Sequence, residues 1–254
     1  MTTSRRAAIG WVLLSSAAAV LAQRPPSFLT ILIDDVGYGD ISAYNQPCKL
    51  DQLCPAPQTP RIDQMAKEGV LLTDFYTAHA SCTPSRAAML TGRLPIRLGV
   101  FPDVYTPLSN CGLPQKEVTV AESLKERGYK TGWVGKWHLG HLQPFLPTEH
   151  GFDFFYGMPY SHDMCPCPQS LTGTSDPEDC HEEEPGCPLM ENEVIVEQPT
   201  QLQSLTRRYA DRAIQFLEEQ VQSDGTEPFF LMVSFQHAHE PQFISPEFNH
   251  SAPA

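Results

Sequence analysis

The segment from Phe28 to Ile33 restricts the fold more than any other part of the chain. It is a short, almost unbroken apolar run rich in β-branched residues, which is typical of a strand covered on both faces in a parallel sheet. Asp34 and Asp35 follow it directly, so we expect both carboxylates at the carboxyl end of that strand. In open parallel sheets this edge is where chemistry gathers. The segment therefore predicts an α/β domain with a site close to residues 34 and 35.

Strand and helix patterns alternate along the rest of the chain. We expect further strands at 70–76, 129–134 and 229–235, and helices at 61–68, 120–127 and 202–220. Thr59 and Pro60 open the first of these helices and Gly69 ends it, as the preferences of helix caps require. The alternation predicts an α/β fold with a mostly parallel sheet and helices on both faces. A length of 254 residues with 41% hydrophobic content suits one such domain, which we place at 26–254.

The region at about 161–199 interrupts this pattern. It contains many prolines, four cysteines and, between Asp176 and Glu193, eight acidic residues with no Lys or Arg. We interpret it as an acidic surface excursion braced by disulfides. Short spacings predict a bridge between Cys48 and Cys54 and two bridges of open connectivity within the excursion, and they leave Cys111 free. The four cysteines of the excursion are Cys165, Cys167, Cys180 and Cys187.

The first 22 residues have the pattern of a secretory signal peptide. Arg5 and Arg6 precede an apolar run that ends at small residues, and a polar, proline-containing stretch follows Ala22. The run is too short for a membrane anchor, and we expect no other span. Export to an oxidising lumen agrees with eight cysteines and with a glycosylation sequon at Asn249, and predicts a lysosomal or extracellular glycoprotein.

The net charge of −13 limits the partners of the chain. Nucleic acids require a basic surface that displaces counterions, so we exclude them. An anionic substrate must instead be attracted by local positive groups.

Cys82 occupies the start of a predicted helix that continues to Arg93. Pro84 lies in its first turn, and Arg86, four residues on, shares the helix face that carries Cys82. Both the helix dipole and the guanidinium would stabilise an anion at residue 82. A disulfide is the ordinary fate of a lumenal cysteine. The residues around Cys82 argue against a disulfide at this position.

Three segments together resemble the sulfatase family. Cys82 to Arg93 matches the pattern Cys-x-Pro-Ser-Arg followed by Ala-Ala-x-Leu-Thr-Gly-Arg, by which sulfatases are recognised for conversion of the cysteine to formylglycine. Gly128 to Gly140 and the opening Asp34-Asp35-x-Gly-Tyr-Gly-Asp40 resemble two further family patterns, in family order. With Pro159 to Asp163, the resemblance is closest to the arylsulfatase A and G branch. It covers the mature chain and implies the alkaline-phosphatase-like fold of sulfatases.

The resemblance implies a sulfuric-ester hydrolase. A formylglycine-generating enzyme in the secretory lumen would convert Cys82, and the hydrated aldehyde would supply one hydroxyl that attacks sulfur and a second that expels sulfate. Asp34, Asp35 and residue 82 would bind Ca²⁺ or Mg²⁺. In isolation, an Asp-Asp pair after a strand more commonly caps a turn.

The resemblance also assigns roles to further residues. Arg86 and Lys136 would hold the aldehyde and sulfate charges, and His138 would handle the proton of the second hydroxyl. On an extended segment the side chains of Lys136 and His138 lie on the same side, and Trp137 between them points the other way, into the hydrophobic packing. His239, two residues before Pro241, is the expected sulfate ligand and acid for the leaving oxygen, whereas His237 is expected to be structural. Ser161 corresponds to a substrate-contacting serine.

The chain departs from the family pattern at its end. Full-length relatives carry a later Asp-Asn pair that completes the metal site and a later lysine that contacts sulfate, so we expect this chain to be the N-terminal portion of a catalytic domain. By itself it should be incompletely folded and nearly inactive, since two carboxylates are too few for Ca²⁺. The alternative is a catalytically impaired form that binds anionic ligands as a decoy. A cysteine-dependent phosphatase is excluded, because its loop needs five residues between Cys and Arg and this chain has three.

Overall fold

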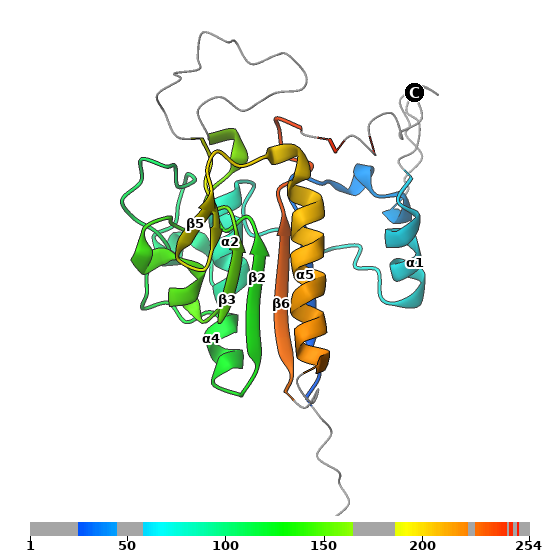
Figure 1. The fold of residues 1–254 in the computed structure, drawn as a ribbon. Coiled ribbons are helices and arrows are strands. Elements are labelled where there is room, and N and C mark those ends of the chain that lie inside the picture. Colours follow the sequence, from blue (N-terminus) through cyan, green and yellow to red (C-terminus); the bar gives the residue numbers. More distant parts are fainter. Residues whose placement is uncertain are drawn as a thin grey trace, which may run out of the picture.

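The computed structural model describes residues 25–44, 58–164, 186–222, 227–242, 244–245 and 248 of the chain. The expected signal peptide, the Cys48 to Cys54 bridge and the sequon at Asn249 lie outside these residues. Figure 1 shows one sheet with helices against both of its faces. Within the described part of the chain, no helix is both long and apolar enough to cross a membrane.

Six strands form the sheet in the order β1-β6-β2-β3-β4-β5. The pairs β1–β6, β6–β2 and β2–β3 are parallel, and β4 and β5 are added antiparallel. The expectation of a mostly parallel sheet is therefore confirmed. The strands are β1 (Phe28–Ile33), β2 (Lys130–Gly135), β3 (Phe154–Gly157), β4 (Leu189–Glu191), β5 (Val194–Glu197) and β6 (Phe229–Phe235).

The described helices agree closely with the sequence pattern. They are α1 (Pro60–Glu68), α2 (Cys82–Thr91), α3 (Pro95–Leu98), α4 (Val120–Lys125) and α5 (Leu205–Gln222). Short 3-10 turns cover Tyr38–Asp40, Ser42–Tyr44, Gln143–Phe145, Pro147–His150, His162–Met164 and Leu202–Ser204. The helix expected at 202–220 thus begins as a 3-10 turn. The three helices predicted from their caps and periodicity are confirmed to within a few residues.

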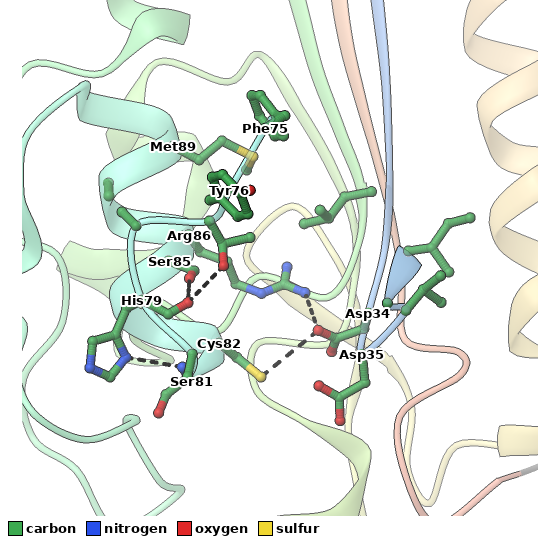
Figure 2. Close-up of a pocket in the computed structure, with 18 of the residues that line it drawn as sticks. Asp34, Asp35, Phe75, Tyr76, His79, Ser81, Cys82, Ser85, Arg86 and Met89 are labelled. Atoms are coloured by element: carbon green, nitrogen blue, oxygen red, sulfur yellow. Dashed lines mark hydrogen bonds and ion pairs between the residues drawn. The ribbon is translucent and has the colours of Figure 1, made fainter. Parts of the chain in front are cut away.

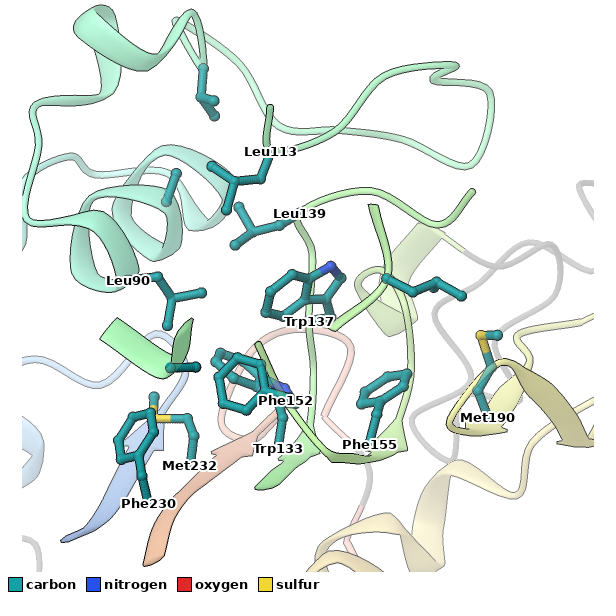
Figure 3. Packing of buried hydrophobic residues seen from close by; sticks show 14 of the residues in the cluster. Leu90, Leu113, Trp133, Trp137, Leu139, Phe152, Phe155, Met190, Phe230 and Met232 are labelled. Carbon is teal, nitrogen blue, oxygen red and sulfur yellow. The ribbon is translucent and has the colours of Figure 1, made fainter. Parts of the chain in front are cut away.

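Two hydrophobic clusters sandwich the sheet. Phe230 and Met232 of β6 point to the face covered by α2 and α4, where Trp133, Trp137 and other aromatic residues pack (Figure 3). Leu231 and Val233 point to the opposite face, which α5 covers. The alternation follows from the period of two along a strand. Both faces of the central strand β6 are buried, and this explains its continuous apolar sequence.

The first strand corrects one expectation. β1 is an edge strand in the described part of the sheet, and Phe28, Leu29, Ile31 and Ile33 are between 37% and 50% exposed. We expected cover on both faces from its apolar sequence. The sequence matches a buried strand, but no described element packs over this edge.

The strand expected at 70–76 is absent, and this segment is a loop. Its backbone carbonyls at Leu72 and Phe75 accept hydrogen bonds from the hydroxyls of Tyr44 and Tyr38, respectively, instead of forming a ladder. A β-rich composition does not make a strand without a neighbouring strand to pair with.

The region at 161–199 is only partly a surface excursion. Residues 165–185 lie outside the described part, but β4 and β5 form a hairpin that extends the sheet beside β3. Asn192, at the turn, has a φ of 54°, which asparagine tolerates well. Leu189 and Met190 are buried, so this end of the region belongs to the core. Cys187 is disulfide-bonded, and Cys111 has a free thiol as predicted.

Candidate active site

Cys82 is the first residue of α2. Ser81 before it is extended, and Pro84 fits the first turn because its missing N–H would have no helical partner there. Gly92 ends the helix with a left-handed φ of 65°. The thiol of Cys82 is free, and the residue is partly buried. The helix N-terminus therefore presents a partly accessible thiol in a field of partial positive charge.

Asp34 and Asp35 follow β1 and have different environments. The backbone N–H of Asp34 donates to the carbonyl of His237 (3.2 Å), so the chain after β1 stays beside the chain after β6. Asp34 is 7% exposed. Asp35 has a φ of 57°, and its side chain is 60% exposed. The carboxyl ends of β1 and β6 thus meet at one edge, as expected for parallel neighbours.

Lys136, directly after β2, is completely buried and binds three groups of the site. Its Nζ donates to Asp34 Oδ2 (2.6 Å) and to Ser161 Oγ (2.8 Å), and it lies 3.5 Å from Cys82 Sγ. Burial of an ammonium group is unfavourable unless it is paired, and these contacts supply the pairing. Lys136 therefore places a cation beside residue 82.

Arg86 approaches the same carboxylate from α2. Its Nη2 lies 3.4 Å from Asp34 Oδ1, and Cys82 Sγ lies 3.8 Å from that oxygen (Figure 2). Its Nη1 donates to the carbonyl of Lys136 and to Ser234 Oγ, both at 2.7 Å. Burial lowers the pKa of Arg86 and Asp34 opposes this, while a guanidinium remains charged at physiological pH.

The pKa of Asp34 results from opposing effects. Burial alone would raise it, but the charges of Arg86 and Lys136 outweigh burial and the pKa lies below its usual value. Asp34 is therefore ionised at neutral pH. Its carboxylate fixes both cations next to Cys82.

His239 lies near Asp35 and residue 82. Its Nε2 is 3.8 Å from Asp35 Oδ2, and its Nδ1 donates to the carbonyl of Glu240 (2.5 Å) and is 3.9 Å from Asp163 Oδ1. A hydrogen bond to Cys82 raises the pKa of His239 to about 9, although burial opposes this. His239 is therefore a protonated donor at neutral pH.

His138 has the opposite character. It is buried, and its Nε2 lies 2.9 Å from the carbonyl of Tyr105. Burial, followed by the charges of Lys136 and Arg86, holds the pKa of His138 well below its usual value. Its φ of 61° also shows that the segment is not extended there, contrary to the geometry that we assumed for residues 136–138. Trp137 packs in the core against Trp133, as expected.

The remaining expected residues also lie near this edge. Ser161 is buried and contacts Lys136. His237 stacks on His162 with ring centroids 6.3 Å apart, and its Nδ1 lies 2.6 Å from Thr206 Oγ1. The tertiary structure therefore brings together residues from five separate segments of the sequence.

A cavity of about 790 Å³ opens between β1 and α2 and reaches Asp34, Cys82 and Arg86. Figure 2 shows Phe75, Tyr76 and Met89 above Arg86, with Asp34 and Asp35 across from Cys82. Most of its wall is apolar, and its charged lining residues are Asp34, Asp35, Arg86 and Arg93. The cavity gives access to Cys82 from the side of β1 and residues 75–81.

The described residues do not form a divalent metal site by themselves. Asp34 and Asp35 provide carboxylate oxygens, but Lys136 and Arg86 already contact the two oxygens of Asp34. Among the described residues, no group of three or more His, Cys, Asp or Glu side chains could hold a metal ion. Ca²⁺ needs about six to eight oxygen ligands, which these two residues cannot supply.

Two contributors were not predicted from the sequence. Ser234 binds Arg86, and as the one polar residue in the apolar run of β6 it offered a signal. Thr83, whose hydroxyl binds the carbonyl of His138, occupies the variable position of its motif and offered none.

Comparison with known proteins identifies the family of this chain. A family described as Sulfatase matches residues 26–253. Arylsulfatase A of Homo sapiens is 44% identical over 247 residues, which cover 93% of this chain and 46% of that protein. Arylsulfatase G of Canis lupus familiaris is 43% identical over 230 residues, which cover 85% of this chain and 41% of that protein.

Solved structures show the same architecture. The sulfatase PsFucS1 from Pseudoalteromonas sp. matches with a TM-score of 0.71 and 30% identity, over 91% of this chain and 47% of that one. Ps i-CgsB matches with a TM-score of 0.67 and 31% identity, over 85% of this chain and 46% of that one. The chain spans about half the length of the relatives that it matches.

Proposed function

This chain belongs to the sulfatase family, and we propose that it carries the nucleophile and the anion-binding groups of a sulfuric-ester hydrolase. The observation that supports this most directly is the convergence of two buried cations and one carboxylate on residue 82. Lys136 Nζ lies 3.5 Å from Cys82 Sγ, and Asp34 contacts both Lys136 and Arg86. Such an arrangement suits an anionic group at residue 82 better than a thiol.

Residue 82 fits conversion to formylglycine. The thiol is free, and it is close to a buried ammonium group and to a protonated imidazole that can hold an oxygen substituent. When present, formylglycine supplies a hydrated aldehyde whose oxygen acts as the nucleophile toward sulfur. The conversion would take place in a secretory lumen and would require a formylglycine-generating enzyme.

The charged residues would bind and polarise the sulfate ester. Lys136 and Arg86 carry fixed positive charge toward residue 82, and Asp34 holds both in place. Because the groups are buried, little reorganisation is needed when negative charge develops on sulfate. Ser161 would orient Lys136 through its hydroxyl and contact the substrate.

Two histidines would divide the proton transfers. His239, which lies 3.8 Å from Asp35 and beside residue 82, would donate a proton to the leaving oxygen. His138 is neutral because its pKa is lowered, so it would accept a proton. Their opposite protonation states are typical of an acid and base pair.

Asp34 and Asp35 would contribute to a Ca²⁺ or Mg²⁺ site only together with further ligands. The described residues alone do not fit a divalent ion. We further propose residues 26–254 as part of one catalytic domain, acting on a sulfate ester in a lysosomal or extracellular setting. The apolar wall of the cavity between β1 and α2 favours a sulfate ester of a small or lipid-linked alcohol.

The first test is a chemical one. The chain is produced in secretory cells that have a formylglycine-generating enzyme, and the tryptic peptide that ends at Arg86 is analysed by mass spectrometry. We expect residue 82 as an aldehyde. A peptide that always carries an alkylatable thiol contradicts the assignment.

The second test measures activity. Because the chain spans about half of its relatives' length, we compare it with a hybrid whose remaining half comes from human arylsulfatase A. We expect aryl sulfate hydrolysis by the hybrid and a loss of at least about 10³-fold in Cys82→Ala, as for removal of a nucleophile. Cys111→Ala, which removes the other free thiol of the described residues, is the control and should leave the rate unchanged. Equal rates in Cys82→Ala and the parent would refute the proposal.

A further inference from the structure

We propose that Thr83 is a positioning residue that holds His138 in one tautomer, with the proton on Nε2 and the lone pair on Nδ1. The inference rests on the proposed function, in which His138 accepts a proton. The inference identifies Nδ1 as the atom of His138 that accepts the proton, and Thr83 as the residue that keeps Nδ1 unprotonated.

Thr83 connects three segments of the chain. It is completely buried, its hydroxyl donates to the carbonyl of His138 (2.8 Å), and it accepts the backbone N–H of Tyr105 (3.2 Å). Both hydrogen-bonding functions of the hydroxyl are thus used. Thr83 follows Cys82 directly, so the helix that carries the nucleophile also holds the backbone that carries His138.

The ring of His138 is fixed by the same loop. Nε2 lies 2.9 Å from the carbonyl oxygen of Tyr105. A carbonyl only accepts hydrogen bonds, so Nε2 must carry the proton. In the neutral ring Nδ1 then has a lone pair. Nδ1 is buried and has no hydrogen-bond partner among the described residues.

The backbone of His138 needs this support. Its φ of 61° lies in the left-handed region, which is unfavourable for a residue with a Cβ. Its N–H donates to the carbonyl of Pro159 (3.0 Å), and its carbonyl accepts from Thr83. Without the hydroxyl of Thr83, one of the two backbone contacts is lost, and the ring can leave Tyr105.

The neighbouring charges favour the same state. Burial, followed by the charges of Lys136 and Arg86, lowers the pKa of His138 and disfavours a second proton, so the ring stays neutral and Nδ1 is an acceptor. Thr83 acts on this state through its hydrogen bonds to the carbonyl of His138 and the N–H of Tyr105, which keep Nε2 within reach of the Tyr105 carbonyl.

The tautomer can be measured directly in the hybrid whose remaining half comes from human arylsulfatase A, because this chain by itself is expected to fold incompletely. With ¹⁵N-labelled histidine, NMR distinguishes a protonated ring nitrogen from one with a lone pair, and His138→Gln identifies the resonance. We expect one Nε2–H tautomer in the wild type, a mixture in Thr83→Val, and the wild-type state again in Thr83→Ser, which keeps the hydroxyl. Unchanged resonances of buried His150 show that the fold persists.

Two results would overturn the proposal. A wild-type His138 with its proton on Nδ1, or with both nitrogens protonated at pH 7, contradicts it without any variant. A Thr83→Val protein that is folded and has the wild-type tautomer also contradicts it.

Activity in the hybrid gives a second measurement. Rates are divided by the fraction of residue 82 that is formylglycine, because position 83 lies in the conversion segment. We expect Thr83→Val to lower kcat by about 3- to 10-fold with little change in KM, as for one lost hydrogen bond. In a His138→Ala background the same change should have no further effect. An equal loss of kcat in both backgrounds contradicts the proposal for Thr83. If the hybrid shows no Cys82-dependent hydrolysis, the proposed function is refuted, and the NMR result then decides the role of Thr83.

Discussion

The single residue on which the site depends most is Asp34. It is buried, its pKa is lowered, and it pairs with Lys136 and Arg86 at 2.6 and 3.4 Å. A buried carboxylate of this kind is stable only while its cations remain. The chemistry of the site and the stability of the domain therefore depend on the same ion pairs.

Removal of Lys136 should be strongly destabilising. Lys136→Met leaves Asp34 buried with Arg86 as its remaining ion-pair partner, and we expect a loss of about 3–5 kcal/mol in the free energy of unfolding, measured by urea denaturation at pH 7. Lys130→Met is the matched control, because Lys130 is 45% exposed and its 3.8 Å pair with Asp153 is at the surface. We expect it to cost less than about 1 kcal/mol. Equal losses in the two variants would show that burial of Lys136 is unimportant.

The same comparison has a defined pH dependence. A carboxylate with a lowered folded pKa adds stability above its unfolded pKa, and this contribution is lost as the pH falls through the folded pKa. The gap between the wild type and Lys136→Met should therefore narrow below about pH 4. A gap that widens on acidification would contradict the ion-pair assignment.

At the scale of secondary structure, the end of β2 determines where Lys136 lies. Gly135 has a φ of 110°, and a Cβ there would overlap the carbonyl of Ser234 on β6. The N–H of Lys136 donates to that same carbonyl at 2.8 Å. The absence of a side chain lets β2 and β6 approach closely and directs Lys136 toward Asp34.

Two glycine substitutions separate the cost of a left-handed backbone conformation from the cost of a clash between a new Cβ and strand β6. Gly128, before β2, has a φ of 79°, and a Cβ there would have no atom within 4 Å. Gly128→Ala should cost about 1–2 kcal/mol, the penalty of a left-handed conformation. Gly135→Ala adds a clash with backbone and should exceed about 4 kcal/mol, measured by urea unfolding or by loss of folded protein. Similar costs would contradict the close approach of β2 and β6.

At the scale of the whole molecule, the described surface has an exposed apolar edge. β1 ends the sheet, and several of its apolar side chains are accessible. Unpaired strand edges with apolar side chains pair readily with other chains. The described surface therefore favours association through β1.

One substitution on β1 and one on α5 test whether the chain associates through β1. Ile31 on β1 and Ile214 on α5 are 50% and 51% exposed, so they are matched in area. In analytical ultracentrifugation of the 254-residue chain, we expect concentration-dependent association that Ile31→Lys reduces and Ile214→Lys leaves nearly unchanged. Equal effects would indicate nonspecific hydrophobic association.

Local sequence determined the elements and indicated the candidate site residues. The apolar run of β6 (Phe229–Phe235), the periodicity of α5 and the caps of α1 predicted their positions, because each depends on neighbours only a few residues away. The position of Cys82 at a helix start and of Asp34 after a strand also followed from local pattern. The motif at Cys82 predicted the family, which the comparisons show.

The family resemblance grouped the expected site residues, whereas the individual contacts were decided by the tertiary structure. Arg86 binds Ser234 across 148 residues, Lys136 binds Asp34 across 102, and Thr83 binds His138 across 55. The expectations of a strand at 70–76 and of cover over both faces of β1 were wrong for the same reason. Strand pairing and burial depend on segments that are distant in the sequence and adjacent in the fold. Single-sequence patterns record the preference of a residue for helix, strand or burial. They contain no information on the partner that a residue meets after the chain has folded.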